Sequence, residues 1–425
     1  MSTPHYHPPL LQRLLAPLMA NRWVNCHLHS AAGRAFYSKL MYRMLTDAHW
    51  APAVRRALRR NQFWRALLVQ PWRRWRFQRQ HGFVPPMAVM ISPSLRCNLS
   101  CKGCFANDWS TSQELPYAAV RDTLVQMDAC GTQLFIIGGG EPFSWPHLFT
   151  LLEEFPHCGF IIYTNGTLID DACAARLART GNMLVAVSIE GFAAEHDARR
   201  GTGCHARAMA GLQALHRAGV ASAFSVTVMR SNHELVLSDA FVDQFEALHC
   251  LMGFYLSYMP VDAAADPEIM PTPEQRAGRR ARIAELQRTK RTVVLDFTND
   301  GPLANGCGAA GRMYVHINPQ GDIEPCPFCH FATHNLRDTS VIEALHTPFL
   351  AAIRTWHATQ HDPLLPCPMI DHPDALRTIV AATGARPTHP SAAKMLHEFA
   401  PALDAYSAAH ARLAVPAGPE RHGRA

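Results

Sequence analysis

The chain has 425 residues, of which 48% are hydrophobic and 17% are charged, so it is long and apolar enough for a large buried core. It contains no run of roughly 18 apolar residues, which excludes a membrane-spanning helix. The first residues also lack the order of a secretory signal. Seven of the 13 cysteines fall into two groups, which indicates metal chemistry rather than a disulfide framework. We therefore expect a cytoplasmic protein.

The charge is distributed unevenly along the chain. Residues 1–107 contain 16 Lys and Arg and a single acidic residue, Asp47, whereas the other 318 residues contain 24 basic and 33 acidic residues. The overall net charge of +6 hides this asymmetry. Such a bias predicts an acidic partner or an anionic surface for the N-terminal part.

Residues 1–85 have a helical, arginine-rich and aromatic pattern. Nine arginines lie between Arg55 and Arg79, interleaved with Trp64, Trp72, Trp75 and Phe77. This pattern suits an interfacial helix that lies on an anionic membrane, which we favour and which would make the protein peripheral at the inner membrane face. A helical cap over the next domain is the second interpretation, and nucleic-acid binding is the least favoured.

Beyond Pro86, short apolar runs alternate with segments of helical length. The runs are residues 88–92, 134–138, 159–164, 183–189, 223–229 and 253–259, and the amphipathic segments between them lie near 116–129, 145–155, 170–180, 205–218 and 234–248. Buried strands that alternate with helices are typical of repeated βα units around a parallel sheet. We expect this α/β domain to occupy residues 86–260.

The rest of the chain divides into two further parts. Residues 261–370 contain a linker, a charged helix at 274–290 and a compact cysteine-rich segment. Residues 371–425 are expected to form a helical C-terminal segment that ends in a disordered tail.

The first cysteine group follows the first predicted strand. Cys97, Cys101 and Cys104 have the spacing C-x3-C-x2-C, so three thiolates can converge on one soft metal centre. Three ligands leave one iron of a four-iron cluster open to bind a small molecule. A zinc site would need a fourth ligand, and no nearby residue supplies one.

This motif resembles the radical S-adenosylmethionine (SAM) superfamily, and the resemblance extends over about residues 85–370. It implies a partial (β/α)6 barrel with the basic helical region before it and a small cysteine-rich extension after it. In the superfamily the three cysteines hold a [4Fe-4S] cluster whose open iron binds S-adenosyl-L-methionine. Reduction then cleaves this cofactor to a 5′-deoxyadenosyl radical. No catalytic side chain beyond the cluster ligands is expected.

The resemblance also assigns a cofactor site at the ends of later strands. Consecutive glycines allow a ligand to approach the backbone closely. The expected cofactor-binding residues are Gly138, Gly139, Gly140, Glu141, Ser188, Glu190 and Arg200. Arg199 and Arg200 could equally be surface charges, and the Thr164–Gly166 turn could be an ordinary turn. All these positions follow strands, where a parallel barrel gathers its chemistry.

The second cysteine group resembles the twitch or SPASM extension of the same superfamily. Its residues are Cys307, Cys326, Cys329 and Cys367, and a hairpin with its turn at 318–321 precedes Cys326. Four cysteines fit one auxiliary [4Fe-4S] cluster, which we favour over structural zinc.

The sequence therefore predicts a radical SAM enzyme that acts on an unactivated carbon. A lipid-like or membrane-associated substrate is favoured by the basic N-terminal region. The alternatives are a peptide or small-metabolite substrate and, last, a non-catalytic iron–sulfur or zinc protein. An electron donor of the flavodoxin or ferredoxin type is the expected partner, and nucleic acid is not.

Overall fold

The structure, a computed structural model, describes residues 38–44, 47, 49, 65–106, 114–261, 264–360 and 362–414. The predictions made for residues 1–37 and 51–64, and for the tail beyond residue 414, lie outside the described residues. The proposed membrane helix is therefore described only in its last part, from residue 65 onward.

A nine-stranded sheet forms the centre of the protein, in the order β7-β6-β5-β4-β3-β2-β1-β8-β9. The strands are β1 (Ala88–Ile91), β2 (Leu134–Ile137), β3 (Gly159–Thr164), β4 (Met183–Ser188), β5 (Ser222–Val228), β6 (Met252–Ser257), β7 (Val293–Asp296), β8 (Tyr314–Ile317) and β9 (Ile323–Glu324). Strands β1 to β8 pair in parallel, and only β9 is antiparallel to its neighbour. The predicted α/β fold is confirmed, and all six predicted runs form strands. Strand β7, which was not predicted, and strand β8, which was predicted only as part of a hairpin, extend the parallel sheet.

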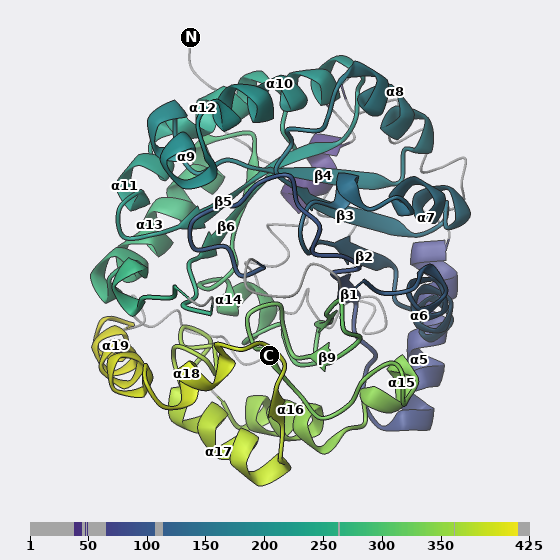
Figure 1. Ribbon diagram of the computed structural model, residues 1–425, viewed down its shortest axis with the longest axis vertical. Helices are drawn as coiled ribbons and strands as arrows, with labels where there is room; N and C mark the ends of the chain where they lie inside the picture. The colour runs from purple at the N-terminus through teal and green to yellow at the C-terminus, as the bar shows by residue number, and fades with distance from the viewer. Residues whose placement is uncertain are drawn as a thin grey trace, which may run out of the picture.

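Helices surround the curved sheet (Figure 1). The helices are α5 (Gln70–His81), α6 (Tyr117–Cys130), α7 (Leu148–Glu154), α8 (Asp171–Thr180), α9 (Ala193–Arg200), α10 (Cys204–Arg217), α11 (His233–Val236), α12 (Asp239–Ala247), α13 (Pro273–Thr289), α14 (Gly301–Ala304), α15 (Val341–Ala344), α16 (Pro348–Thr359), α17 (Pro373–Thr383), α18 (Ala392–Leu396) and α19 (Ala400–Leu413). Short elements complete the chain at Arg65–Val69, Pro142–Ser144 and Pro267–Ile269 and in the small β10–β11 pair (Phe331–Ala332 and Arg386–Pro387). No helix in the described ranges is both long and apolar enough to cross a membrane.

Local sequence explains where several of these elements begin and end. The side chain of Thr272 accepts a hydrogen bond from Gln275 N and starts α13 with a capping box, directly before Pro273. Gly181 ends α8 in the left-handed conformation, at φ 65°. Most strands carry buried residues on both faces, as β1 does at all four positions, because helices cover the outer face and side chains fill the inner face, whereas β2 and β3 alternate buried and half-buried residues.

The N-terminal region packs against the barrel wherever it is described. Leu40 and Met44, in the helical segment 38–44, contact the core at the starts of the later strands, where Arg43 Nη1 donates a hydrogen bond to Leu251 O at 3.0 Å. Helix α5 lies against α6 (Figure 1). Arg65 and Arg73 each form an ion pair of 2.8 Å with Asp128 of α6. Residues 38–44 and 65–81 therefore cover the barrel.

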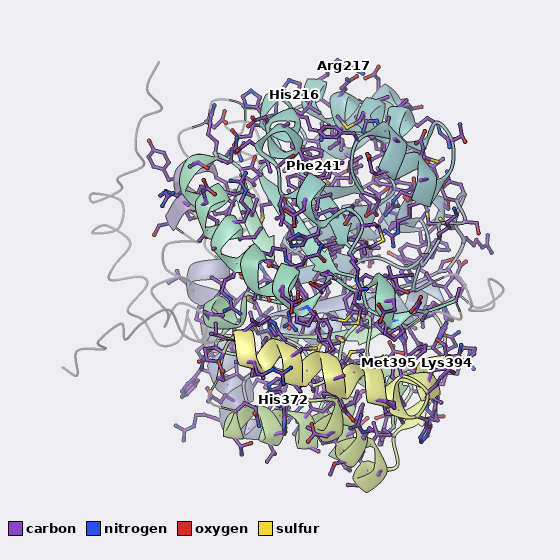
Figure 2. The ribbon with its side chains drawn as sticks, turned by 90° about the vertical axis from the view of Figure 1, so that its left-hand side faces the viewer. His216, Arg217, Phe241, His372, Lys394 and Met395 are labelled. Carbon is purple, nitrogen blue, oxygen red and sulfur yellow. The ribbon has the colours of Figure 1, made fainter. Side chains whose placement is uncertain are left out.

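The C-terminal extension continues the same sheet. Strands β8 and β9 form the predicted hairpin, whose turn is closed by the bond from Gly321 N to Asn318 O at 2.9 Å. Figure 2 shows the C-terminal helices, with His372 before α17 and Lys394 and Met395 in α18, below the barrel helices that carry His216, Arg217 and Phe241. Helix α19 contacts α13 and α17, so the extension and the barrel are packed together.

Candidate active site

A cavity of about 220 Å³ lies at the carboxyl ends of the parallel strands. One side of it is polar and contains the first cysteine group. This side is lined by Cys97, Cys101, Cys104, Gly138, Gly139, Gly140, Thr164, Asn165, Ser188, Glu190, Arg199, Arg200, Ser225 and Thr227. The expected residues after β1, β2 and β4 thus meet in one place, together with residues from the ends of β3 and β5, as the parallel topology requires.

The cysteine loop is anchored by helix α9. Lys102 N donates a hydrogen bond to Arg199 O at 3.0 Å, and Arg199 Nη2 donates one to Gly103 O at 3.2 Å. Cys101 is buried, and burial raises the pKa of its thiol to about 11 although the nearby Arg200 opposes this shift. Metal binding at this thiol must therefore displace a proton.

The glycine triplet is required by the same loop. A Cβ atom at Gly139 would lie 2.4 Å from Ser94 O, and one at Gly140 would lie 2.3 Å from Arg96 O. Gly139 also has a φ of +101°, which L side chains rarely adopt. The amide of Gly140 donates to Ser94 O at 3.0 Å. The glycines therefore bring the strand end against the cysteine loop as well as opening the backbone to a ligand.

Glu141 lies beneath the cavity and does not line it. Its carboxylate accepts hydrogen bonds from Thr164 Oγ1 at 2.7 Å, Asn165 N at 2.8 Å and Phe143 N at 3.1 Å. Burial raises the pKa of Glu141 despite these bonds. In turn, Asn165 Nδ2 donates to Asn98 Oδ1 at 2.8 Å, which links the turn after β3 to the cysteine loop. Glu141 thus braces the 164–166 turn under the cavity.

Ser188 and Glu190 both face the cavity at the end of β4. Glu190 is fully buried and forms ion pairs with Arg199 at 2.6 Å and Arg200 at 2.5 Å. Burial opposes ionisation, but the two arginines hold the pKa of Glu190 below its usual value. The arginine side chains are only 10% and 12% exposed. They are therefore not surface charges.

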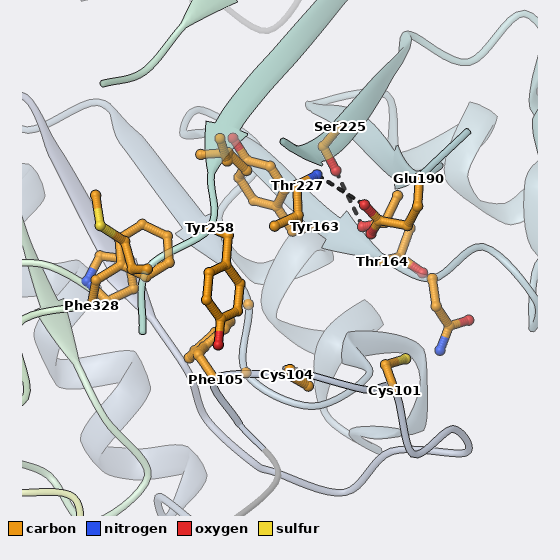
Figure 3. A pocket seen from close by; sticks show the side chains of 18 of the residues that line it. Cys101, Cys104, Phe105, Tyr163, Thr164, Glu190, Ser225, Thr227, Tyr258 and Phe328 are labelled. Atoms are coloured by element: carbon orange, nitrogen blue, oxygen red, sulfur yellow. Dashed lines mark hydrogen bonds between the residues drawn. The ribbon is translucent and has the colours of Figure 1, made fainter. Parts of the chain in front are cut away.

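The other side of the cavity is aromatic and apolar (Figure 3). Figure 3 shows Cys101 and Cys104 at one end and Phe105, Tyr258 and Phe328 farther along the wall. This side is lined by Met90, Phe105, Ile136, Tyr163, Leu256, Ser257, Tyr258, Met259, Phe297, Tyr314, Pro327 and Phe328. Phe105 and Phe328 meet edge to face with their ring centres 6.1 Å apart. A neutral, apolar group would suit this half of the cavity.

The second cysteine group lies behind this wall. Pro327 and Phe328, which line the cavity, separate Cys326 from Cys329, and Cys329 N donates to Cys326 O at 3.1 Å. Burial raises the pKa of Cys329 well above its usual value, and the neighbouring Cys326, Cys367 and Cys307 raise it further. The four thiols are thus close enough to interact electrostatically.

The spacing of the sulfur atoms bears on the metal that each group could hold. Across the described ranges, neither cysteine group brings three sulfur atoms within 4.8 Å of one another. A tetrahedral zinc ion with Zn–S bonds near 2.3 Å needs sulfur atoms about 3.8 Å apart. Neither group therefore holds three sulfur atoms in a ready tetrahedral zinc arrangement among the described residues.

Several residues of this site were not predicted. Arg199 was left as a possible surface charge, yet it both holds Glu190 and anchors the cysteine loop. Thr227 N donates to Glu190 Oε2 at 3.0 Å, and Asn232 Nδ2 donates to Glu190 O at 3.0 Å. The signal for Thr227 was its place at the end of the fifth strand. The aromatic residues gave no sequence signal, because aromatic residues are common in cores.

Comparison with known proteins identifies the class. The family model for the radical SAM superfamily matches residues 91–235. A mycofactocin maturase, MftC, from Mycobacterium ulcerans is 32% identical over 59% of this chain and 71% of its own length. An AdoMet-dependent heme synthase from Methanosarcina barkeri is 31% identical over 60% of this chain and 80% of its own length.

Solved structures share the fold. SuiB of Streptococcus suis, bound to precursor peptide SuiA, superimposes with a TM-score of 0.56 at 18% identity, over 69% of this chain and 72% of that chain. The enzyme anSMEcpe with bound AdoMet gives a TM-score of 0.56 at 15% identity, over 77% of this chain and 99% of that chain.

The chain belongs to the radical SAM superfamily. It is an enzyme that uses a [4Fe-4S] cluster and S-adenosyl-L-methionine, and the predicted class of protein and cofactors are confirmed. The three cysteines and the polar residues around them fit these groups, because they line one cavity at the strand ends.

Proposed function

We propose that Cys97, Cys101 and Cys104 hold the [4Fe-4S] cluster and that the polar half of the cavity holds S-adenosyl-L-methionine. When bound, the reduced cluster supplies the electron that cleaves the cofactor to a 5′-deoxyadenosyl radical. Gly138, Gly139 and Gly140 offer backbone groups at the cavity wall, and Ser188 and Glu190 offer polar side-chain atoms. Arg200 acts through Glu190, whose charge it stabilises, and Glu141 acts through the turn that it braces.

The second cysteine group is proposed to hold an auxiliary [4Fe-4S] cluster through Cys307, Cys326, Cys329 and Cys367. The described thiols do not form the compact set that a tetrahedral zinc ion needs. The position of these residues behind Tyr314, Pro327 and Phe328 would place the cluster next to the apolar half of the cavity. There it can exchange an electron with a substrate radical.

We infer that the substrate presents an uncharged aromatic or aliphatic group of a peptide to this cavity. The observation that carries this inference is the lining: among its described residues, the charged ones other than the cysteines are Glu190, Arg199 and Arg200, which pair with one another. A tetrapyrrole, whose carboxylates need cationic partners, fits poorly. The similarity to a maturase and to SuiB bound to its precursor peptide points the same way.

The experiment is anaerobic cleavage of S-adenosyl-L-methionine by reconstituted enzyme with dithionite, with 5′-deoxyadenosine quantified by mass spectrometry. Cys101→Ala should abolish product, whereas Cys173→Ala, a half-buried cysteine outside both groups, should not. A pool of capped synthetic peptides rich in Phe, Tyr, Val and Leu should raise product formation above the basal rate. Stimulation by coproporphyrin alone would contradict the peptide assignment.

A second candidate is a lipid-like or membrane-associated substrate, and one surface favours it. Leu68 and Trp72 are 65% and 53% exposed, and Arg76 and Arg79 stack over Trp72 and Trp75. Apolar side chains beside cations suit an anionic lipid surface. This end of the N-terminal region would then keep the enzyme at the inner face of a membrane.

Co-sedimentation with vesicles of mixed neutral and anionic lipid tests this surface. The Trp72→Ser/Arg76→Gln variant should lose binding, and the matched Trp356→Ser/Arg217→Gln variant on other faces should not. Equal sedimentation of the two variants would contradict the membrane proposal while leaving the peptide proposal intact.

An electron donor of the flavodoxin or ferredoxin class is the proposed protein partner, because the cluster must be reduced before each cleavage. Replacement of dithionite by a reduced flavodoxin should sustain 5′-deoxyadenosine formation. Failure with both a flavodoxin and a ferredoxin would contradict this assignment.

A further inference from the structure

Two of the tyrosines that line the cavity have hydroxyl groups without a hydrogen-bond partner in the described part of the chain. Tyr163, near the end of β3, and Tyr314, at the start of β8, both line it. Packing fixes their rings, since Tyr163 lies 5.6 Å from Phe254 and Tyr314 lies 5.8 Å from Phe297, measured between ring centres. Neither hydroxyl has a hydrogen-bond partner in the described part of the chain, and neither oxygen is fully buried.

Both phenols keep their protons at neutral pH. Burial raises the pKa of Tyr163 above its usual value. Burial also raises the pKa of Tyr314. Both side chains line the same cavity as Cys97, Cys101 and Cys104.

We propose that Tyr163 or Tyr314 donates a hydrogen atom to the 5′-deoxyadenosyl radical when no substrate fills the cavity. This proposal rests on the proposed function. The phenolic O–H bond breaks and a C–H bond forms, so the products are 5′-deoxyadenosine and a tyrosyl radical. This transfer is downhill because a phenolic O–H bond is weaker than the C–H bond that replaces it. One electron from the reductant and one proton from water then restore the tyrosine.

The two tyrosines would thereby protect the enzyme. Without them, the radical would attack the nearest C–H bond of the chain, and that damage could not be reversed. Excluding side reactions of a reactive group is a task of the protein rather than of the cofactor. Both phenols lie on the wall where substrate is expected. A bound substrate would therefore keep the radical away from them.

Cofactor cleavage in D₂O, without substrate, tests the proposal. A phenolic hydrogen exchanges with D₂O before the reaction, whereas carbon-bound hydrogens do not. Wild-type enzyme with dithionite should therefore form mostly monodeuterated 5′-deoxyadenosine. The deuterated fraction should fall severalfold in Tyr163→Phe/Tyr314→Phe and in at least one of the single variants. The control Tyr117→Phe, at the start of α6 and not among the residues that line the cavity, should match wild type.

The isotope readout separates the two proposals. Unlabelled 5′-deoxyadenosine from wild type, or full deuteration in the double variant, would overturn the assignment of the two tyrosines while the radical enzyme stands. A loss of deuterium that occurs only in the variant Tyr258→Phe, at the third tyrosine of the cavity, would also overturn this assignment. No 5′-deoxyadenosine at all would overturn the proposed function and this inference together. Freeze-quenched samples of wild type should also show a tyrosyl signal by electron paramagnetic resonance that the double variant lacks.

Discussion

The ion pair between Arg276 and Asp371 joins the barrel to the second cysteine group, and we expect its removal to be costly. Both side chains are fully buried, and Arg276 Nη1 lies 2.5 Å from Asp371 Oδ1. Asp371 Oδ2 in turn accepts a hydrogen bond from Cys367 N at 2.9 Å. Arg276→Met would leave a buried carboxylate unpaired next to a proposed cluster ligand.

The magnitude follows from burial. Removing one partner of a buried pair costs about 3–5 kcal/mol. Unfolding entropy of about 2.1 cal/mol/K per residue corresponds to about 0.9 kcal/mol/K for 425 residues, so the Tm should fall by about 3–6 °C. Arg276→Met/Asp371→Leu should recover most of this loss, because the unpaired charge is removed as well.

The assay is thermal and urea unfolding of reconstituted enzyme, followed by circular dichroism, with iron content measured on the same samples. The matched control is Arg217→Met, whose ion pair with Asp171 is exposed at 57% and 75% and should contribute at most about 1 kcal/mol. Iron at the second cysteine group should fall in Arg276→Met while cofactor cleavage persists. Equal stability of Arg276→Met and Arg217→Met would refute the reasoning.

Three further predictions concern single residues. Gly140→Ala should lose iron from the first cysteine group, because its Cβ would lie 2.3 Å from Arg96 O, whereas Gly278→Ala in α13, with no atom within 4 Å, should raise stability by about 0.5–1 kcal/mol. Glu190→Gln should weaken cofactor binding in equilibrium dialysis, since two arginines lose their counter-charge; unchanged affinity would contradict its place in the site. Burial and then Arg276 lower the pKa of His410 to about 4, so the unfolded chain takes up a proton near pH 6.5 and the folded chain only near pH 4. The free energy of unfolding should therefore fall by about 3 kcal/mol because of this group as the pH drops through that window. His410→Leu should reduce the dependence of the unfolding free energy on pH, and an unchanged dependence would refute the prediction.

The sequence predicted the parallel sheet because its strands are continuous apolar runs between helical segments, a pattern that burial on both faces imposes. Strand β7 was missed because Val293–Asp296 is a short run directly after a charged helix. Strand β8 was assigned to a hairpin only, since its pairing with β1 joins residues far apart in the chain.

The functional site, like the sheet, could be predicted only where the sequence pattern is local. Residues in local motifs, such as Cys97 to Cys104 and the glycine triplet, could be assigned from those motifs and their resemblance to the superfamily. The pairing of Glu190 with Arg199 depends on how α9 folds back over the strand end, which no local pattern specifies. Tyr163 and Tyr314 line one cavity only when β3 and β8, which are far apart in the chain, join the same sheet.

The pairing of β1 with β8 has a consequence for synthesis of the protein. The first strand emerges from the ribosome about 220 residues before its partner at Tyr314–Ile317. At typical elongation rates of 5–20 residues per second, that edge stays open for about 10–45 s. An unpaired strand edge is a site of wrong association. The nascent chain therefore needs protection during this interval, for example by chaperones, before the edge is closed.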